Sequence, residues 1–156
     1  MRLHNWGFEN PGVFERVFDG MIENTGAVIL GRRTYDNSIP EWGGSGPIGD
    51  VPCIVLTHNP PANAGPIFTF VTDGVESALA RAREAAGDKR IGLMGADVPR
   101  QFLAAGLVDE IRIHPVDVLL GGGRRMFEEL PKRIDLQQTG LREDGGVAHV
   151  VYRVVR

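Results

Sequence analysis

Four short apolar runs predict buried β-strands in the first two thirds of the chain. Each run holds four or five residues that are almost all apolar: Ala27–Leu30, Cys53–Thr57, Ile67–Val71 and Ile91–Met94. A strand with one wet face alternates apolar and polar residues, so runs of this kind are typical of strands covered on both faces.

Segments with apolar residues at helical spacing lie between these runs. A first helix is expected to begin at Asn10-Pro11, where a cap residue precedes a proline, and to end near Asn24. A second begins around Arg32 or Arg33. Residues 38–50, which are rich in Gly and Pro, then predict a loop.

Two further helices carry signals at their ends. Asp73 is expected to cap one of them, with Glu76 at the capping-box position and Gly87 at its end. The other covers residues 97–105 and stops at Gly106.

The last third of the chain predicts strands joined by turns. Its expected elements are a strand over Glu110–Leu120 whose register breaks near Pro115, a turn at Gly121–Gly123, a short helix over Arg124–Leu130, and an antiparallel hairpin of Ile134–Arg142 and Val147–Val155.

Strands that alternate with helices predict an α/β fold. We expect a mainly parallel sheet with helices on both faces and a C-terminal antiparallel hairpin. In such sheets ligands bind outside the carboxyl ends of the strands. The segments expected there are Gly31–Tyr35, Thr57–Asn59, Thr72-Asp73 and Gly95–Val98.

Composition narrows the class of protein. The 156 residues fit one domain with one core, and a net charge of −3 without long runs of like charge argues against nucleic-acid binding. The one cysteine, Cys53, suits a reducing cytoplasm and is expected to be a small core residue. No apolar stretch approaches the roughly 20 residues of a membrane helix. Residues 1–6 lack the apolar core of a secretory signal, so we expect a cytoplasmic protein without a membrane partner.

The sequence gives little support to several kinds of functional site. The letters G-x-G-x-x-G occur at residues 44–49, but they precede a strand instead of following one, so a plain loop is expected. The sequence has no G-x-S-x-G segment of the esterase kind. The histidines are scattered without metal-ligand spacing, and no metal site is predicted: they are His4, His58, His114 and His149.

Two strand ends have the composition of a phosphate site. At Gly31-Arg32-Arg33-Thr34 a strand ends in glycine and arginines open a helix, and both helix N–H groups and guanidinium groups bind phosphate. Surface charge and helix capping explain the segment equally well. At Gly95-Ala96-Asp97-Val98 small residues would let a ligand approach the backbone, although a tight turn capped by Asp97 is the simpler interpretation. Thr57-His58 could meet a phosphate or ribose, or be ordinary loop residues.

These segments carry a resemblance to a known family. Residues 27–35, Ala-Val-Ile-Leu-Gly-Arg-Arg-Thr-Tyr, resemble the strand-and-helix opening of dihydrofolate reductases. More specifically, residues 101–113 and 118–127 resemble the reductase domain of bacterial riboflavin-biosynthesis deaminase-reductases and its stand-alone relatives. The likeness runs from about residue 26 to the end of the chain.

The resemblance implies an NADPH-dependent reductase of a small, pteridine- or pyrimidine-like substrate, and two arginines at a phosphate site favour NADPH over NADH. The catalytic residues stay unknown. The residues implied to bind the cofactor are Gly31, Arg32, Arg33 and Thr34 at its phosphates; Leu56, Thr57 and His58 near its adenosine, with Arg32 or His58 at the 2′-phosphate; and Gly95, Ala96, Asp97 and Val98 around its pyrophosphate.

The chain departs from the family pattern in two ways. Relatives usually carry two glycines where this chain has Gly95-Ala96, and alanine adopts fewer backbone conformations. Relatives also usually begin with a further strand, which in the family fold lies between those matching residues 91–94 and 111–115 and lines the site where substrate meets nicotinamide. The single domain over residues 1–156 is therefore expected to lack its first strand.

Three explanations of the second departure compete. The true start lies upstream of Met1, the chain is a natural fragment, or the flanking strands pair directly or borrow a strand from a partner. The first is favoured, because an open sheet centre leaves backbone groups unpaired.

Two rivals to the reductase hypothesis remain open. One is a non-catalytic nucleotide-binding remnant, and the other is an assembly subunit that forms a homodimer through the hairpin of residues 134–155. Little polar surface is expected on that hairpin because of Val150, Val151, Val154 and Val155. Three aromatic residues could face a substrate but are more simply explained by packing: Tyr35, Trp42 and Trp6.

Overall fold

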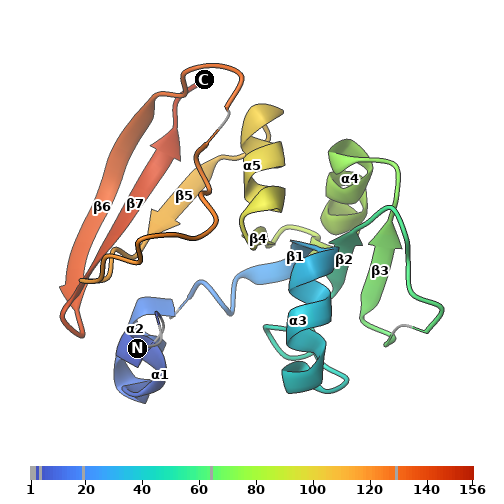
Figure 1. Cartoon of the computed structure of the whole chain (residues 1–156), viewed down its shortest axis with the longest axis horizontal. Coiled ribbons are helices and arrows are strands. Elements are labelled where there is room, and N and C mark those ends of the chain that lie inside the picture. The colour runs from blue at the N-terminus through green and yellow to red at the C-terminus, as the bar shows by residue number, and fades with distance from the viewer. Residues whose placement is uncertain (1–2, 4, 19, 64, 129) are drawn as a thin grey trace.

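The computed structural model describes residues 3, 5–18, 20–63, 65–128 and 130–156 (Figure 1). Met1, Arg2 and His4 lie outside the described residues. The helices and strands follow in the order α1 (Asn5–Phe8), α2 (Pro11–Phe18), β1 (Thr25–Gly31), α3 (Arg32–Trp42), β2 (Cys53–Leu56), β3 (Phe68–Val71), α4 (Val75–Ala86), β4 (Arg90–Met94), α5 (Asp97–Ala104), β5 (Glu110–Ile113), β6 (Leu136–Asp144) and β7 (Val147–Val154). None of the described helices is long and apolar enough to cross a membrane.

Strand β1 is the centre of a parallel sheet. Its residues Ala27, Ile29 and Leu30 have no exposed surface, as the uninterrupted apolar run predicts. β1 pairs with β2 on one side and β4 on the other, and β3 pairs with β2, so the strand order is β3-β2-β1-β4.

Helices cover both faces of this sheet. Ala27 and Ile29 pack into a core with α4 and α5, whereas Val28 and Leu30 pack with Tyr35 of α3. Figure 1 shows α3 on one side of β1 and β2, with α4 and α5 on the other. Alternate residues of one strand therefore belong to two cores, and the predicted fold class is confirmed.

The C-terminal strands form a second, antiparallel sheet in the order β5-β7-β6. β6 and β7 are joined at Gly145-Gly146, whose φ angles of 60° and 74° suit the tight turn of a hairpin. The predicted hairpin is confirmed.

Helix α5 connects the two sheets. Phe102 on α5 is 1% exposed and lies in a core that includes Leu93 of β4 and Ile111 of β5. β4 and β5 do not pair with each other among the described strands, so the structure does not have the direct pairing that one of the three explanations offered. Arg90 Nη1 donates to Glu110 Oε1 at 3.0 Å, which places the first residues of β4 and β5 at the same end.

The helix boundaries differ from those expected in the first third of the chain. α2 ends at Phe18 instead of near Asn24, and Gly20, with a φ of 67°, has a backbone conformation that no α-helix continues through. Residues 38–42 belong to α3 and not to a loop, and the helix includes Pro40 close to its end at Trp42.

Two predicted caps are also wrong. Gly74, with a φ of 105°, precedes α4 and no side chain caps that helix, so Asp73 is not its cap. Ala96 is the N-cap of α5, and Asp97 is its first residue.

The segment after β5 is more irregular than expected. β5 stops at Ile113 instead of continuing to Leu120, because Pro115 has no N–H group for a ladder. Glu129 lies outside the described residues, and the rest of the expected helix over residues 124–130 consists of bends and irregular chain.

Gly26 offers a test of the packing around β1. A Cβ atom at Gly26 would lie 2.6 Å from the Ala86 carbonyl oxygen and 2.7 Å from the Ala86 Cα, both on the backbone of α4. Overpacking costs about 1–3 kcal/mol, so Gly26→Ala should lower the free energy of unfolding in urea by that amount.

Gly44→Ala is the matched control. A Cβ atom at Gly44 would meet nothing within 4 Å, so this variant should stay within about 0.5 kcal/mol of the unchanged chain. Equal stability of the two variants would show that α4 does not press on β1 as described.

Candidate functional site

A cavity of about 850 Å³ opens at the carboxyl edge of the parallel sheet. β1, β2 and β4 end there at Gly31, Leu56 and Met94. All eleven residues predicted to bind a cofactor line it: Gly31, Arg32, Arg33, Thr34, Leu56, Thr57, His58, Gly95, Ala96, Asp97 and Val98. The structure therefore brings together segments that lie up to 67 residues apart, counted from Gly31 to Val98.

Three helices begin at this cavity without a side-chain cap. Gly31 is the N-cap of α3 and Ala96 that of α5, and neither makes a capping hydrogen bond through its side chain. Gly74, the N-cap of α4, also lines the cavity and makes none. Because N–H groups of a first helical turn lack partners within the helix and the helix dipole is positive there, these three helix ends favour an anion.

Gly95 and Thr34 meet between two of these helix starts. Gly95 has a φ of 91°, and a Cβ atom there would lie 2.7 Å from Thr34 Oγ1. Both facts require glycine. Ala96 has a φ of −106° and a ψ of −45°, which any residue adopts, so alanine carries no backbone penalty at that position.

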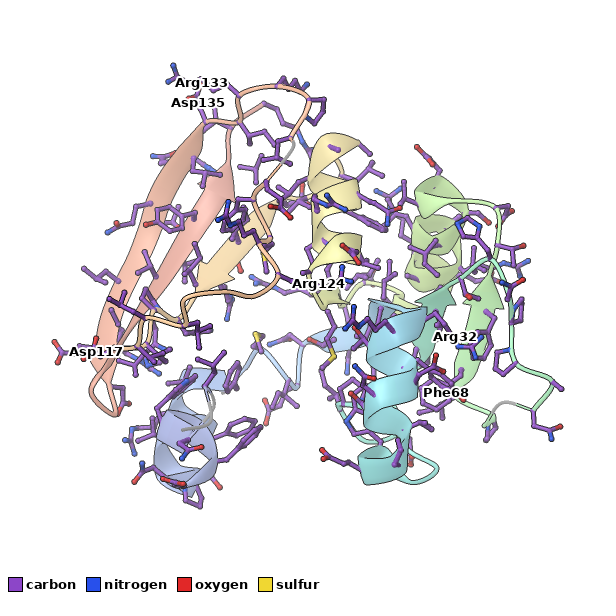
Figure 2. The ribbon with its side chains drawn as sticks, viewed as in Figure 1. Arg32, Phe68, Asp117, Arg124, Arg133 and Asp135 are labelled. Carbon is purple, nitrogen blue, oxygen red and sulfur yellow. The ribbon has the colours of Figure 1, made fainter. Side chains whose placement is uncertain are left out.

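Arg32 is held in place between α3 and the loop after β2. Its Nε donates to Asp36 Oδ1 at 2.7 Å, and its Nη1 donates to the carbonyl oxygen of Asn59. Arg33, by contrast, is exposed and makes no hydrogen bond or ion pair with the described residues. Figure 2 shows Arg32 at the start of α3. One guanidinium group is thus fixed near the β2 loop and the other is free to move toward a ligand.

Arg124 is a lining residue that the sequence did not reveal. Its Nη1 donates to Asp97 Oδ2 at 2.8 Å, and Asp97 Oδ1 accepts from Arg100 at 3.3 Å. Asp97 therefore holds Arg124 beside the start of α5 instead of capping the helix (Figure 2). The two residues lie 27 positions apart, and Arg124 belongs to an irregular segment, so no local pattern could have indicated the contact.

The positions of other lining residues could have been predicted from the sequence. Asn37 follows Thr34 by three positions on α3, and Gln101 follows Val98 by three on α5, so helical spacing places each beside a predicted residue. Asn59 and Thr72 lie in strand-end segments that were expected at the edge of the sheet. Gly74 and Met94 complete the lining.

Two of the aromatic residues and Cys53 have packing roles. Tyr35 is 7% exposed and makes edge-on ring contacts with Phe68 and Phe70, and Trp42 packs against the same cluster. Cys53 is fully buried, and burial raises the pKa of its thiol to about 11, so it is an unreactive core residue. For these three residues the packing interpretation is confirmed.

A second polar cluster lies between the N-terminal helices and the antiparallel sheet. The Nδ1 atoms of His114 and His149 are 2.6 Å apart, and the ring centroid of Trp6 lies 5.5 Å and 4.9 Å from theirs. Burial, helped by the neighbouring His149, lowers the pKa of His114 to about 4. The sequence separates these histidines by 35 residues, and the pairing of β5 with β7 brings them together.

Comparison with known proteins identifies the family. A model of the RibD C-terminal domain matches residues 6–150. The chain belongs to the RibD C-terminal domain family. The resemblance stated from the sequence is therefore confirmed.

Proteins of known sequence or structure are similar to most of this chain. Uncharacterized protein YwjB of Bacillus subtilis is 26% identical over 151 residues, which are 95% of this chain and 84% of that protein. A solved structure from Shewanella sp. PV-4, assigned by its name to riboflavin biosynthesis, has a TM-score of 0.80 at 22% identity and covers 97% of this chain and 88% of its own.

A longer relative contains the same fold as one part. The diaminohydroxyphosphoribosylaminopyrimidine deaminase/5-amino-6-(5-phosphoribosylamino)uracil reductase of Thermotoga maritima has a TM-score of 0.64 at 18% identity. The likeness covers 87% of this chain and 47% of the Thermotoga chain. This RibD C-terminal domain therefore corresponds to about half of that protein, and the family membership supports a reductase-type function.

The low pKa of His114 predicts how stability changes with pH. An unfolded chain takes up this proton near the ordinary value of 6.5, whereas the folded chain does so only near pH 4. Between these values the unfolded state binds more protons, so the urea midpoint should fall as the pH is lowered from about 7.5 to about 4.5.

His114→Phe should flatten that decline, because phenylalanine keeps the ring contacts with Trp6 and Phe18 but does not titrate. The exposed His58 supplies the control variant His58→Phe, which should decline as the unchanged chain does. A second decline is expected below pH 3.8, where Asp144, whose pKa the bonded Arg16 lowers to about 2, loses its charge in the unfolded state first. An equally steep loss in His114→Phe above pH 4 would contradict the assignment.

Proposed function

We propose that this chain is an NADPH-binding reductase domain of the dihydrofolate-reductase-like kind that transfers hydride to a small substrate. The observation that carries the proposal is the convergence of all eleven implied cofactor residues on one cavity, which three uncapped helix ends and several arginines make attractive to phosphate.

The lining residues fit a dinucleotide that lies in the orientation implied by the family resemblance. Gly95 lines the cavity at the start of α5 and has no side chain, so a pyrophosphate could approach its backbone closely. The guanidinium group of Arg32, held at the loop that carries His58 and Asn59, suits a 2′-phosphate at the adenosine end. Arg33 and Thr34 supply a mobile cation and a hydroxyl at the start of α3.

NADPH, when bound, would supply the hydride, and the protein would bind and orient both reactants. The substrate class that we propose is pteridine- or pyrimidine-like, in keeping with the uracil derivative in the name of the Thermotoga protein. No described residue is assigned as a proton donor to that substrate. A cytoplasmic location and a homodimer belong to the same proposal.

The alternative function is nucleotide binding without catalysis. The observation that favours it is the lack of pairing between β4 and β5, because the family's first strand is expected there and lines the site of hydride transfer. Tight NADPH binding without any reduction of added pteridine or pyrimidine compounds would support this alternative.

A titration with NADPH and NADH followed by nicotinamide fluorescence tests the cofactor assignment. The full chain should bind NADPH more tightly than NADH. Arg32→Gln should weaken NADPH binding about tenfold or more and NADH binding much less, because a charge-assisted contact to the 2′-phosphate contributes roughly 1.5–3 kcal/mol.

Arg81→Gln is the matched control, since Arg81 is an exposed arginine on α4 that does not line the cavity. It should leave both affinities unchanged. Gly95→Ala should weaken both cofactors, because the loss does not depend on the 2′-phosphate. Equal binding of the two cofactors by the unchanged chain and by Arg32→Gln would contradict the role given to Arg32.

A further inference from the structure

A second cavity, of about 280 Å³, lies between helix α2 and the antiparallel sheet. It shares no lining residue with the cavity at the parallel sheet. Its lining residues are Val17, Phe18 and Met21 from the N-terminal segment, Arg112 and His114 from β5 and the residue after it, and Gly140, Leu141, Arg142, His149 and Val151 from the hairpin.

The lining combines apolar walls with cationic groups. Phe18, Met21 and Val151 supply apolar surface, and Gly140 contributes no side chain. Arg112 and Arg142 are the charged residues of the lining, and no carboxylate lies among the described lining residues. A ligand that fits this composition has a flat apolar body and a negative charge.

The two arginines are held by contacts that leave donors unused. Arg112 Nε donates to Glu110 Oε1 at 2.8 Å, and Arg142 Nη2 donates to the carbonyl oxygen of Arg16 at 2.6 Å. The Nη groups of Arg112 have no partner among the described residues. A fixed guanidinium group with free donors binds a carboxylate at a low entropic cost.

The hydrogen bonds of the histidine pair define which ring nitrogen of each histidine carries the proton. His149 Nε2 lies 3.1 Å from the carbonyl oxygen of Asp144, which can only accept, so His149 Nε2 carries the proton. His149 Nδ1 is then an acceptor, and His114 Nδ1, 2.6 Å away, must be the donor. A neutral His114 therefore keeps a bare Nε2, and this atom has no partner among the described residues.

This pair is a hydrogen-bonded relay and not a metal site. Within the part of the chain that the structure describes, no group of three His, Cys, Asp or Glu side chains could hold a metal ion. The bare Nε2 atom of His114 can accept a hydrogen bond from a donor on the ligand. Arg112 can bind a negatively charged group of the same ligand.

We propose that the cavity between α2 and the antiparallel sheet binds a small planar anion that also carries a hydrogen-bond donor, such as a heteroaromatic carboxylate with a ring N–H. Arg112 binds the carboxylate, and His114 Nε2 accepts the ring N–H. Phe18 and Met21 cover the ring. The site is separate from the proposed cofactor site, so either proposal can be correct when the other is wrong.

Three probes of nearly equal shape separate the two polar contacts. Pyrrole-2-carboxylate has both the charge and the N–H group, furan-2-carboxylate lacks the N–H group, and pyrrole-2-carboxamide lacks the charge. Calorimetric titration of the full chain should show pyrrole-2-carboxylate binding at least tenfold more tightly than either of the others. Equal affinities for all three, or no binding of pyrrole-2-carboxylate at millimolar concentration, would overturn the proposal.

Variants assign the contacts to residues. Arg112→Gln should reduce the affinity for pyrrole-2-carboxylate at least tenfold and abolish its advantage over pyrrole-2-carboxamide. His114→Phe should abolish its advantage over furan-2-carboxylate. Arg133→Gln, which changes an arginine that is 87% exposed and lines neither cavity, is the matched control and should bind as the unchanged chain does.

Histidine NMR signals of the unchanged chain provide a test that needs no variant. Pyrrole-2-carboxylate should shift the ring ¹⁵N signals of His114 and leave those of His58, which lines the other cavity, in place. A shift at His58 alone would overturn the proposal. NADPH titrations of the same samples report the proposed cofactor site separately, so failure of one site is distinguishable from failure of the other.

Discussion

Close packing of helices against β1 is the constraint on which the rest of the structure depends. Gly26 allows the backbone of α4 to approach the strand, and at Gly31 an added Cβ would already touch Val98 of α5. Gly95 lets the end of β4 reach Thr34 on α3. Because these approaches leave no room for a Cβ atom or only just enough, the starts of α3 and α5 are fixed relative to one another, and the cavity between them has a definite shape.

Helix α5 connects the parallel sheet to the C-terminal sheet by packing against both. It begins at the cavity, and its residue Phe102 lies in a core shared with β4 and β5, whereas the described β4 and β5 have no backbone pairing between them. Side-chain packing and the Arg90–Glu110 ion pair therefore carry the connection that a continuous sheet would make with hydrogen bonds.

Most of the fold could be predicted from the sequence because buried strands leave an unambiguous apolar run, as at residues 27–30. The strand ends indicated where a ligand should bind, since parallel strands present their carboxyl ends at one edge. The assignment of cofactor residues there came from the family resemblance. What could not be predicted depends on long-range contacts. Arg124 reaches the site only through Asp97, and the histidine pair exists only because β5 aligns with β7. The caps expected at Asp73 and Asp97 failed because Gly74 and Ala96 occupy those positions and the Asp97 carboxylate binds arginines instead.

Carboxylates in this chain position arginines, which explains how an acidic protein can present cationic cavities. The net charge is −3, yet Asp36 holds Arg32, Asp97 holds Arg124 and Glu110 holds Arg112. Each carboxylate restrains one guanidinium group and also competes with any anion for it, so an arginine alone is a modest anchor. At the larger cavity the helix starts supply N–H groups that no carboxylate engages through a cap. Affinity for phosphate should therefore rest mainly on those backbone groups, and the arginines should decide which phosphate is chosen.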